Sequence, residues 1–551
     1  MKVLYPSICL GLLLLSSSLM AQKVLAEVVL EELETDETIY PYLSWGPNRV
    51  FPFLQHDPAL RLEDGSYFFV WKPDKISSRL LRYSNYDLLL NERWTKEFEL
   101  ERNEEILGLV ESTGGDSLFL LTQQPEYFQN RIQVAYRTVD LKTGEMGQYR
   151  LLQIVEGRHG ETVFLEFSPD RQRFAIFYLD HPSPRRSPSI DYEFIDAQQR
   201  AAWHGYRVGR VCFSVWDRSL KQVRLDTLTV PERKHVLMGC LLDDEANFYA
   251  YLHQRKNMLV VAQSPADGSD DLQMVYREEV PDLYDFTEGI EGRTPPAIGA
   301  EQKIFWPLAK REPTGRDRGI KSYRLVCFDF AQEAVDDQRH AEITSTLLVA
   351  VEKQREAYSL RPLRRFDNYQ IQEMLPLPDG SVWLVVQQHM ETAYPSVPNP
   401  QMAQPTPSEG RAEELVMFYF DPEGVIRQAL VVPSVQLMRE FEDRIGGFYH
   451  LRLDTANRVV HLLTREAAGE KYRDPDRLFY RKIYLDTGLI TDRQQVYEGE
   501  RRRQYWLKGF TEWMTPSILM FMHMEGSEGD AHLISVDLDA PPLNDDEARG
   551  E

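Results

Sequence analysis

The chain has 551 residues, of which 42% are hydrophobic and 11% aromatic, so it can bury a sizeable core and is not expected to be disordered. Its 86 acidic and 63 basic side chains give a formal net charge of −23. Nucleic acids and anionic membranes are bound through an excess of Lys and Arg, so this composition argues against both as main partners.

The first 26 residues have the pattern of a secretory signal peptide. Lys2 precedes an apolar stretch at 10–15, a serine-rich stretch follows, and Ala21 and Ala26 are alternative cleavage positions. The apolar stretch is too short to span a bilayer as a helix. We therefore expect 1–26 to be removed, leaving an exported protein, periplasmic or secreted, that has no membrane span.

After this segment the chain contains Cys212, Cys240 and Cys327, each inside a strand-like run of apolar residues. An odd number leaves at least one thiol without a partner in the monomer. The pattern predicts small apolar core residues and no disulfide framework.

One phrase, a polar turn followed by a short strand, recurs along the chain. Its two clearest copies are LEDGSYFFVW at 62–71 and LPDGSVWLVV at 377–386. The copy near 302 is the weakest. In chain order, the residues that enter the strand are Ser66, Ser117, Gln172, Asn247, Gln302, Ser381, Asn457 and Ser517.

A second phrase follows each copy: a strand, a tight turn often closed by glycine, and another strand. Gly144, Gly424 and Gly488 stand where such a hairpin requires positive φ, and a preceding Asp can cap the turn. Two hairpins make four antiparallel strands, and eight such units predict an all-β fold, a single β-propeller. The ring would have seven blades if the copy at Gln302 were an insertion.

The predicted propeller covers 27–539, and an acidic disordered tail is expected at 540–551. Because the last repeat lacks its outer strand, we expect 27–34 to pair into it and close the ring. A short helix is expected only at 432–445. The spacing of the repeats predicts four inserted loops, at 181–205, 284–300, 309–319 and 390–414.

These phrases resemble known propeller repeats. LPDGSVWLVV is similar to the Asp-Gly-x-x-Trp phrase of two-component-regulator and lyase-type repeats, and VDLKTGEM and YLDTGLI resemble the turn of quinoprotein-like repeats. The resemblance implies a propeller. It transfers no catalytic residue, because the Trp usual after the quinoprotein Gly is replaced by Met146 or Leu489 and the histidine motif of the lyases is missing.

No catalytic motif is found: the chain has no Gly-x-Ser-x-Gly elbow, no His-Glu-x-x-His pair and no phosphate or dinucleotide fingerprint. No metal site is predicted and no cofactor is implied. His523 and His532 could face each other across a hairpin, but two histidines do not complete a zinc site.

The inserted segment 281–292 carries carboxylates interleaved with aromatic rings, as sugar-binding and cation-binding sites do. A solvated loop is the alternative. The candidate ligand-binding residues are Asp282, Tyr284, Asp285, Glu288 and Glu291.

The sequence therefore favours a binding or scaffold module for a protein or glycan partner, rather than an enzyme. The alternative is a hydrolase or lyase that acts on extracellular glycans or peptides through a carboxylate-lined axial funnel. The two differ in structure. An enzyme needs ionisable groups with perturbed pKa values from several blades at the axis, and a scaffold needs an exposed apolar patch.

Overall fold

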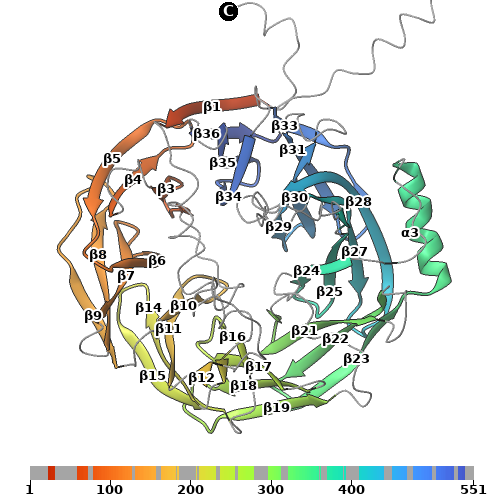
Figure 1. The fold of residues 1–551 in the computed structure, drawn as a ribbon, viewed down its shortest axis with the longest axis horizontal. Helices are drawn as coiled ribbons and strands as arrows, with labels where there is room; N and C mark the ends of the chain where they lie inside the picture. Colours follow the sequence, from red (N-terminus) through yellow and green to blue (C-terminus); the bar gives the residue numbers. More distant parts are fainter. Residues whose placement is uncertain are drawn as a thin grey trace, which may run out of the picture.

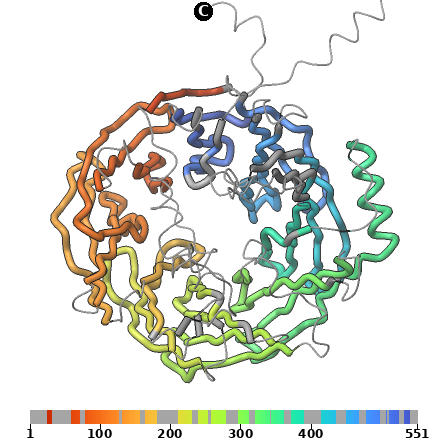
Figure 2. Tube along the Cα trace, in the orientation of Figure 1, coloured from red at the N-terminus to blue at the C-terminus, as the bar shows by residue number. Residues whose placement is uncertain are grey.

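Each of the eight turn-and-strand phrases begins the second strand of a four-stranded antiparallel sheet. In the computed structural model the eight sheets stand around a central axis and form a closed β-propeller (Figures 1 and 2). The structure describes residues 23–30, 59–71, 79–126, 131–156, 163–180, 183–184, 206–207, 210–230, 236–254, 258–277, 296–311, 320–358, 360, 366, 369–388, 390–392, 409–439, 449–467, 476–498, 504–525 and 531–539.

The strands of each blade follow one another in sequence from the axis outwards. Blade 1 consists of β2 (Ala59–Arg61), β3 (Tyr67–Trp71), β4 (Leu80–Tyr86) and β5 (Glu92–Glu99). Blade 2 consists of β6 (Glu105–Glu111), β7 (Ser117–Glu126), β8 (Arg131–Asp140) and β9 (Arg150–Glu156). Blade 3 consists of β10 (Phe164–Phe167), β11 (Arg173–Asp180), β14 (Arg210–Asp217) and β15 (Gln222–Thr229). Blade 4 consists of β16 (Val236–Leu242), β17 (Phe248–Gln254), β18 (Met258–Ser264) and β19 (Leu272–Arg277).

The second half of the ring repeats this order. Blade 5 consists of β20 (Ala297–Ile298), β21 (Lys303–Arg311), β22 (Ile320–Asp329) and β23 (Ala334–Glu342). Blade 6 consists of β24 (Tyr369–Pro376), β25 (Val382–Gln388), β27 (Glu409–Phe420) and β28 (Ile426–Arg439). Blade 7 consists of β29 (Tyr449–Asp454), β30 (Val459–Ala467), β31 (Asp476–Tyr484) and β33 (Gln494–Glu498). Blade 8 consists of β34 (Gln504–Trp513), β35 (Ile518–Glu525), β36 (Ala531–Asp537) and β1 (Lys23–Leu30).

The ring closes through its N-terminal strand, as predicted, and it has eight blades, because the weakest copy of the phrase does form β20 and β21. β1 is the outer strand of blade 8 and pairs antiparallel with β36, from Lys23 opposite Asp537 to Leu30 opposite Ala531. This strand begins four residues earlier than the predicted 27–34; of that range, 31–34 lies outside the described residues.

The repeated phrase makes the same turn in blades 1 and 6. Gly65 and Gly380 have φ values of 79° and 82°, which only glycine adopts without strain. In each turn an Asp carboxylate accepts the backbone N–H of the Ser two residues later, at 2.9 Å in blade 1 and 3.0 Å in blade 6. Glycines 144, 424 and 488 also have the predicted positive φ.

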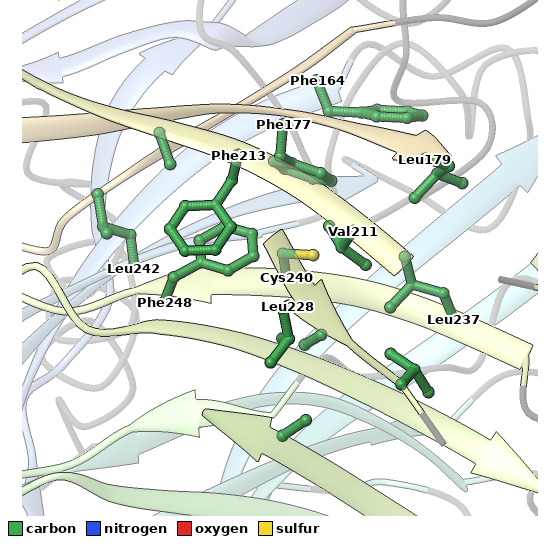
Figure 3. Packing of buried hydrophobic residues seen from close by; sticks show 14 of the residues in the cluster. Phe164, Phe177, Leu179, Val211, Phe213, Leu228, Leu237, Cys240, Leu242 and Phe248 are labelled. Atoms are coloured by element: carbon green, nitrogen blue, oxygen red, sulfur yellow. The ribbon is translucent and has the colours of Figure 1, made fainter. Parts of the chain in front are cut away.

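Eight hydrophobic clusters fill the spaces between neighbouring blades, one at each interface. Figure 3 shows the cluster between blades 3 and 4, where the rings of Phe213 and Phe248 stack with centroids 4.1 Å apart. Cys240 packs in this cluster; it and Cys327 are buried, as predicted for core residues, whereas Cys212 is partly exposed, and all three are free thiols. A blade cannot bury both its faces alone, so the closed ring is the stable unit.

Because successive strands of a blade run in opposite directions, the connections between them lie alternately on the two faces of the ring. The turn face is the side on which the first strand of each blade leads into the second. These turns are short, at 62–66, 112–116, 168–172, 243–247, 299–302, 377–381, 455–458 and 514–517. The connection face is the opposite side, on which the chain passes from blade to blade. All four predicted insertions join strands there.

Strands extend into all four of those insertions, and β21 runs through Arg311 into 309–319. β12 (Ser183–Pro184) and β13 (Tyr206–Arg207) add to the axial side of blade 4, because β13 pairs with β16. Ala297–Ile298 is the first strand of blade 5, and β26 (Met390–Thr392) pairs with the start of β27. Apart from 296 and 299–300, the remaining parts of these loops and the tail at 540–551 lie outside the described residues.

The helix expected at 432–445 is wrong, because β28 continues through Arg439 as the partner of β27. Cross-strand pairing overrides the local pattern there; 440–445 is outside the described residues. A helix instead occurs at α3 (Ser345–Ala357), outside the ring beside blade 6 (Figure 1), capped by Thr344. Its buried side is narrow, with Val351 and Arg355, and Arg355 forms a buried ion pair with Glu414.

Polar contacts on the turn face tie neighbouring blades together. Arg218 of blade 3 donates to the carbonyls of Glu111 and Ser112 in blade 2, both at 2.8 Å, and to the Glu63 carboxylate of blade 1 at 2.5 Å. Arg458 of blade 7 donates to Asp379 of blade 6 at 2.9 Å. Arg218 and Arg458 therefore stabilise the ring on this face.

Candidate functional site

The predicted ligand-binding residues Asp282, Tyr284, Asp285, Glu288 and Glu291 lie outside the described residues. The strands on either side of this segment, β19 and β20, end and begin on the connection face. Ligand binding by this segment therefore remains a prediction.

The innermost strands carry two carboxyl groups with perturbed acidity, Glu105 on β6 and Glu166 on β10. Desolvation raises the pKa of both, that of Glu166 to about 8. Solvent nevertheless reaches both side chains, since Glu105 is exposed and Glu166 is partly exposed. Both carboxyl groups are therefore desolvated by the protein around them while part of each side chain stays accessible. We call this pair the axial carboxyls.

A hydrogen-bond chain joins the two blades at this point. Gln123 donates from Nε2 to a Glu105 carboxylate oxygen at 2.9 Å and accepts the backbone N–H of Val163 at 3.2 Å. Val163 immediately precedes β10, the strand that carries Glu166. Gln123 therefore fixes Glu105 relative to the neighbouring inner strand, as a positioned functional group requires.

Two further groups interact electrostatically with Glu166. Burial, and after it the charge of Glu166, raises the pKa of the Cys240 thiol and of the Tyr251 hydroxyl. The Tyr251 ring crosses β16 at Gly239, where a Cβ atom would lie 2.2 Å from the tyrosine oxygen. Position 239 must therefore be glycine for this hydroxyl to reach the inner strand.

At neutral pH these groups are mostly uncharged hydrogen-bond donors: a carboxylic acid, a phenol and a thiol. Cys240 and Tyr251 are buried, so of these three only Glu166, which is partly exposed, can meet a ligand, and a carboxyl group with a pKa near neutrality can donate a hydrogen bond or transfer a proton. Within the described part of the chain, no group of three or more His, Cys, Asp or Glu side chains is arranged to hold a metal ion.

A second candidate surface lies on the outside of the ring, over blades 2 to 4. The outer strands β9, β15 and β19 each pair on one side, so they are edge strands. They carry apolar side chains that are between 44% and 63% exposed. We call these residues the side patch: Leu151, Ile154, Val223, Leu225 and Val275.

Contacts between the blades hold these three edges together. The Ser214 hydroxyl of blade 3 donates to Gln153 on β9 at 2.6 Å. Gln273 on β19 donates from Nε2 to the carbonyl of Thr229 on β15 at 3.0 Å. The residues of the side patch therefore lie on the outer strands of three consecutive, hydrogen-bonded blades.

His523 and His532 do face each other, as predicted, with ring centroids 5.5 Å apart. His532 hydrogen-bonds through Nδ1 to the Glu27 carboxylate of β1 at 2.7 Å. His523 is buried against Tyr497 of blade 7, and this burial lowers its pKa to about 3. The pair packs blade 8 and gives no metal site among the described residues.

Neither axial carboxyl was predicted from the sequence. Glu105 begins β6 and Glu166 lies within β10, in the unremarkable sequences NEEILGL and VFLEFSP, and their environment forms only when the ring closes. A single acidic residue within the apolar run at 163–167 was the available indication of Glu166.

No family model matches the chain, and no curated protein matches it. Solved structures similar to it include the Saccharomyces cerevisiae protein Sqt1 (10% identity, TM-score 0.41, 95% of this chain and 100% of that one). Others are prolyl oligopeptidase B from Galerina marginata (11%, 0.39, 88% and 58%) and the polysaccharide lyase Uly1 (12%, 0.36, 77% and 88%).

The chain thus spans little more than half the length of the prolyl oligopeptidase it matches. Sequence identities of 10–12% to these structures do not indicate a shared function. In the part of the chain that the structure describes, no helix is long and apolar enough to cross a membrane.

Proposed function

We propose that this chain is an exported binding module that holds a protein partner against the outer edges of blades 2 to 4. The side patch is the observation that carries this proposal. Edge strands with exposed apolar side chains offer both hydrophobic area and unpaired backbone groups, which is how proteins capture an extended segment of a partner. The signal-peptide pattern at 1–26 supports export.

The acidic composition is consistent with this role. With a net charge of −23, the protein repels other copies of itself and other acidic proteins, so an apolar patch can be tolerated without general aggregation. Partners that bring a basic rim around an apolar segment would be favoured.

The experiment compares capture of partners from the native envelope and secreted fractions by three proteins. These are the wild type, an Ile154→Lys/Leu225→Lys variant of the side patch, and a Leu489→Lys control. Leu489 is 58% exposed and lies on blade 7. A stoichiometric partner lost by the patch variant and kept by the control supports the proposal. A partner kept by all three contradicts it.

Self-association is tested in the same variants by sedimentation. If the wild type dimerises and the patch variant does not, the partner is a second copy of this chain. If none of the proteins has a partner, the side patch is not a binding surface.

The axial carboxyls favour a second candidate, a hydrolase or lyase acting on glycans or peptides. Glu166, with a pKa of about 8, has the acidity of a general acid working near neutral pH. Turnover of a glycan and peptide panel that disappears in Glu166→Gln, while the variant stays folded, would establish this activity. Absence of turnover by the wild type would leave binding as the function.

A further inference from the structure

Two arginines from different blades meet where the axis opens on the turn face. Arg61 ends β2 of blade 1 and donates from Nη1 to the carbonyl of Trp513 at 3.3 Å. Arg452 on β29 of blade 7 donates from Nη1 to the carbonyl of Thr515 at 3.2 Å. Both carbonyls belong to the end of β34 and the turn that follows it, so blade 8 holds both guanidinium groups, and their charges interact.

Neither arginine forms an ion pair with a carboxylate of the described residues. Other turn-face arginines do: Arg458 contacts Asp379 at 2.9 Å and Asp486 at 2.5 Å. In a chain with 86 acidic and 63 basic side chains, carboxylates are plentiful, so two guanidinium groups that have no carboxylate partner among the described residues need a reason.

The surroundings hold Arg452 in place. Its guanidinium lies over the Trp513 ring, 5.5 Å from the centroid. Burial, and after it the charge of Arg61, lowers the pKa of Arg452, and Asp454 and Glu512 offset this only in part. The Asp454 carboxylate is itself occupied by the backbone and side-chain N–H groups of Asn457, at 3.0 and 2.8 Å.

We propose that Arg61 and Arg452 form a binding site for one oxyanion group, a carboxylate or a phosphate. Each guanidinium has five N–H donors and gives one to a backbone carbonyl among the described residues, so donors remain for a ligand. Planar guanidinium groups match carboxylate and phosphate oxygens, and an anion between the two removes their mutual repulsion.

Two sources could supply this group: a free ligand, or the acidic end of this chain. β36 ends at Asp537 on the turn face. The sequence after the described residues contains Asp545, Asp546, Glu547 and Glu551. A variant in which these four are changed to Asn or Gln keeps the full chain and distinguishes the two sources.

The test is calorimetric titration of the full chain with inorganic phosphate and with acetate, at constant ionic strength set with chloride. The variants are Arg61→Gln and Arg452→Gln. Arg150→Gln is the control, because Arg150 is exposed on β9 and its replacement removes the same charge as the site variants do. We expect saturable binding that either site variant weakens about tenfold or more, since each loses charge-assisted hydrogen bonds. The control should bind like the wild type.

If the tail supplies the group, the wild type shows no binding, whereas the tail-neutral variant binds phosphate or acetate in a way that requires both arginines. Binding by the wild type itself assigns the site to a free ligand. Absence of binding by both proteins, or equal binding by the site variants and the control, overturns the proposal.

Discussion

Replacing Glu166 with Gln should stabilise the protein at alkaline pH. Desolvation raises the pKa of this carboxyl group from its usual 4.5 to about 8. The folded chain therefore binds more protons at Glu166 than the unfolded chain does. Its contribution to stability is favourable below the unfolded pKa, declines as the pH rises from 4.5 to about 8, and is a full penalty above that.

A rise in pKa from 4.5 to about 8 corresponds to about 5 kcal/mol, at about 1.4 kcal/mol for each pKa unit. Solvent reaches part of the side chain and screens its charge, so we expect a smaller effect, about 2 to 4 kcal/mol. Glu166→Gln removes the ionisable group and keeps the shape of the neutral acid. Its gain in unfolding free energy should appear at about pH 9 and vanish at about pH 5.

The assay is urea unfolding of the wild type and of Glu166→Gln across that pH range, followed by fluorescence. Glu333→Gln is the control, because Glu333 is exposed in the turn between β22 and β23. It should leave the pH dependence of the wild type unchanged. If Glu166→Gln and the wild type have the same pH dependence, Glu166 is not desolvated and its place in the candidate axial site is wrong.

Three further predictions test the ring. Leu30→Ala in the closing strand should lower the unfolding free energy by about 2 to 4 kcal/mol in urea titrations, because Leu30 is buried against blade 1. Arg218→Ala should lower it by about 3 kcal/mol or more, since Glu111 and two carbonyls lose their buried partner; an unchanged midpoint would refute this brace. If the proposed export occurs, intact mass of the mature protein should show cleavage after Ala21, because cleavage after Ala26 would remove half of β1.

The architecture could be predicted from the sequence because local turn motifs mark the strands of each blade. Each blade repeats a polar turn with Asp, Gly or Ser and an alternating strand, and φ values above 60° at Gly144, Gly424 and Gly488 follow from the sequence alone. Closure was predictable too, since blade 8 has too few strands. The bounds of β1 were not, because both 23–26 and 31–34 are compatible with a strand and the register with β36 decides between them.

The candidate sites were less predictable, for physical reasons. The axial carboxyls and the pair of Arg61 and Arg452 come from blades distant in sequence, and their environment exists only after closure. The helix α3 was missed because its buried side includes Arg355, which a search for apolar periodicity does not count. The side patch looks in sequence like ordinary alternating strands; exposure of both its edge and its apolar side chains is a property of the ring.

Hydrogen exchange of the protein with and without its captured partner tests the proposed function most directly. The account predicts that the partner protects amides of the edge strands β9 and β15, because an added segment would occupy their unpaired backbone groups. Protection confined to the connection face or to the inner strands β6 and β10, with β9 and β15 unchanged, would contradict it.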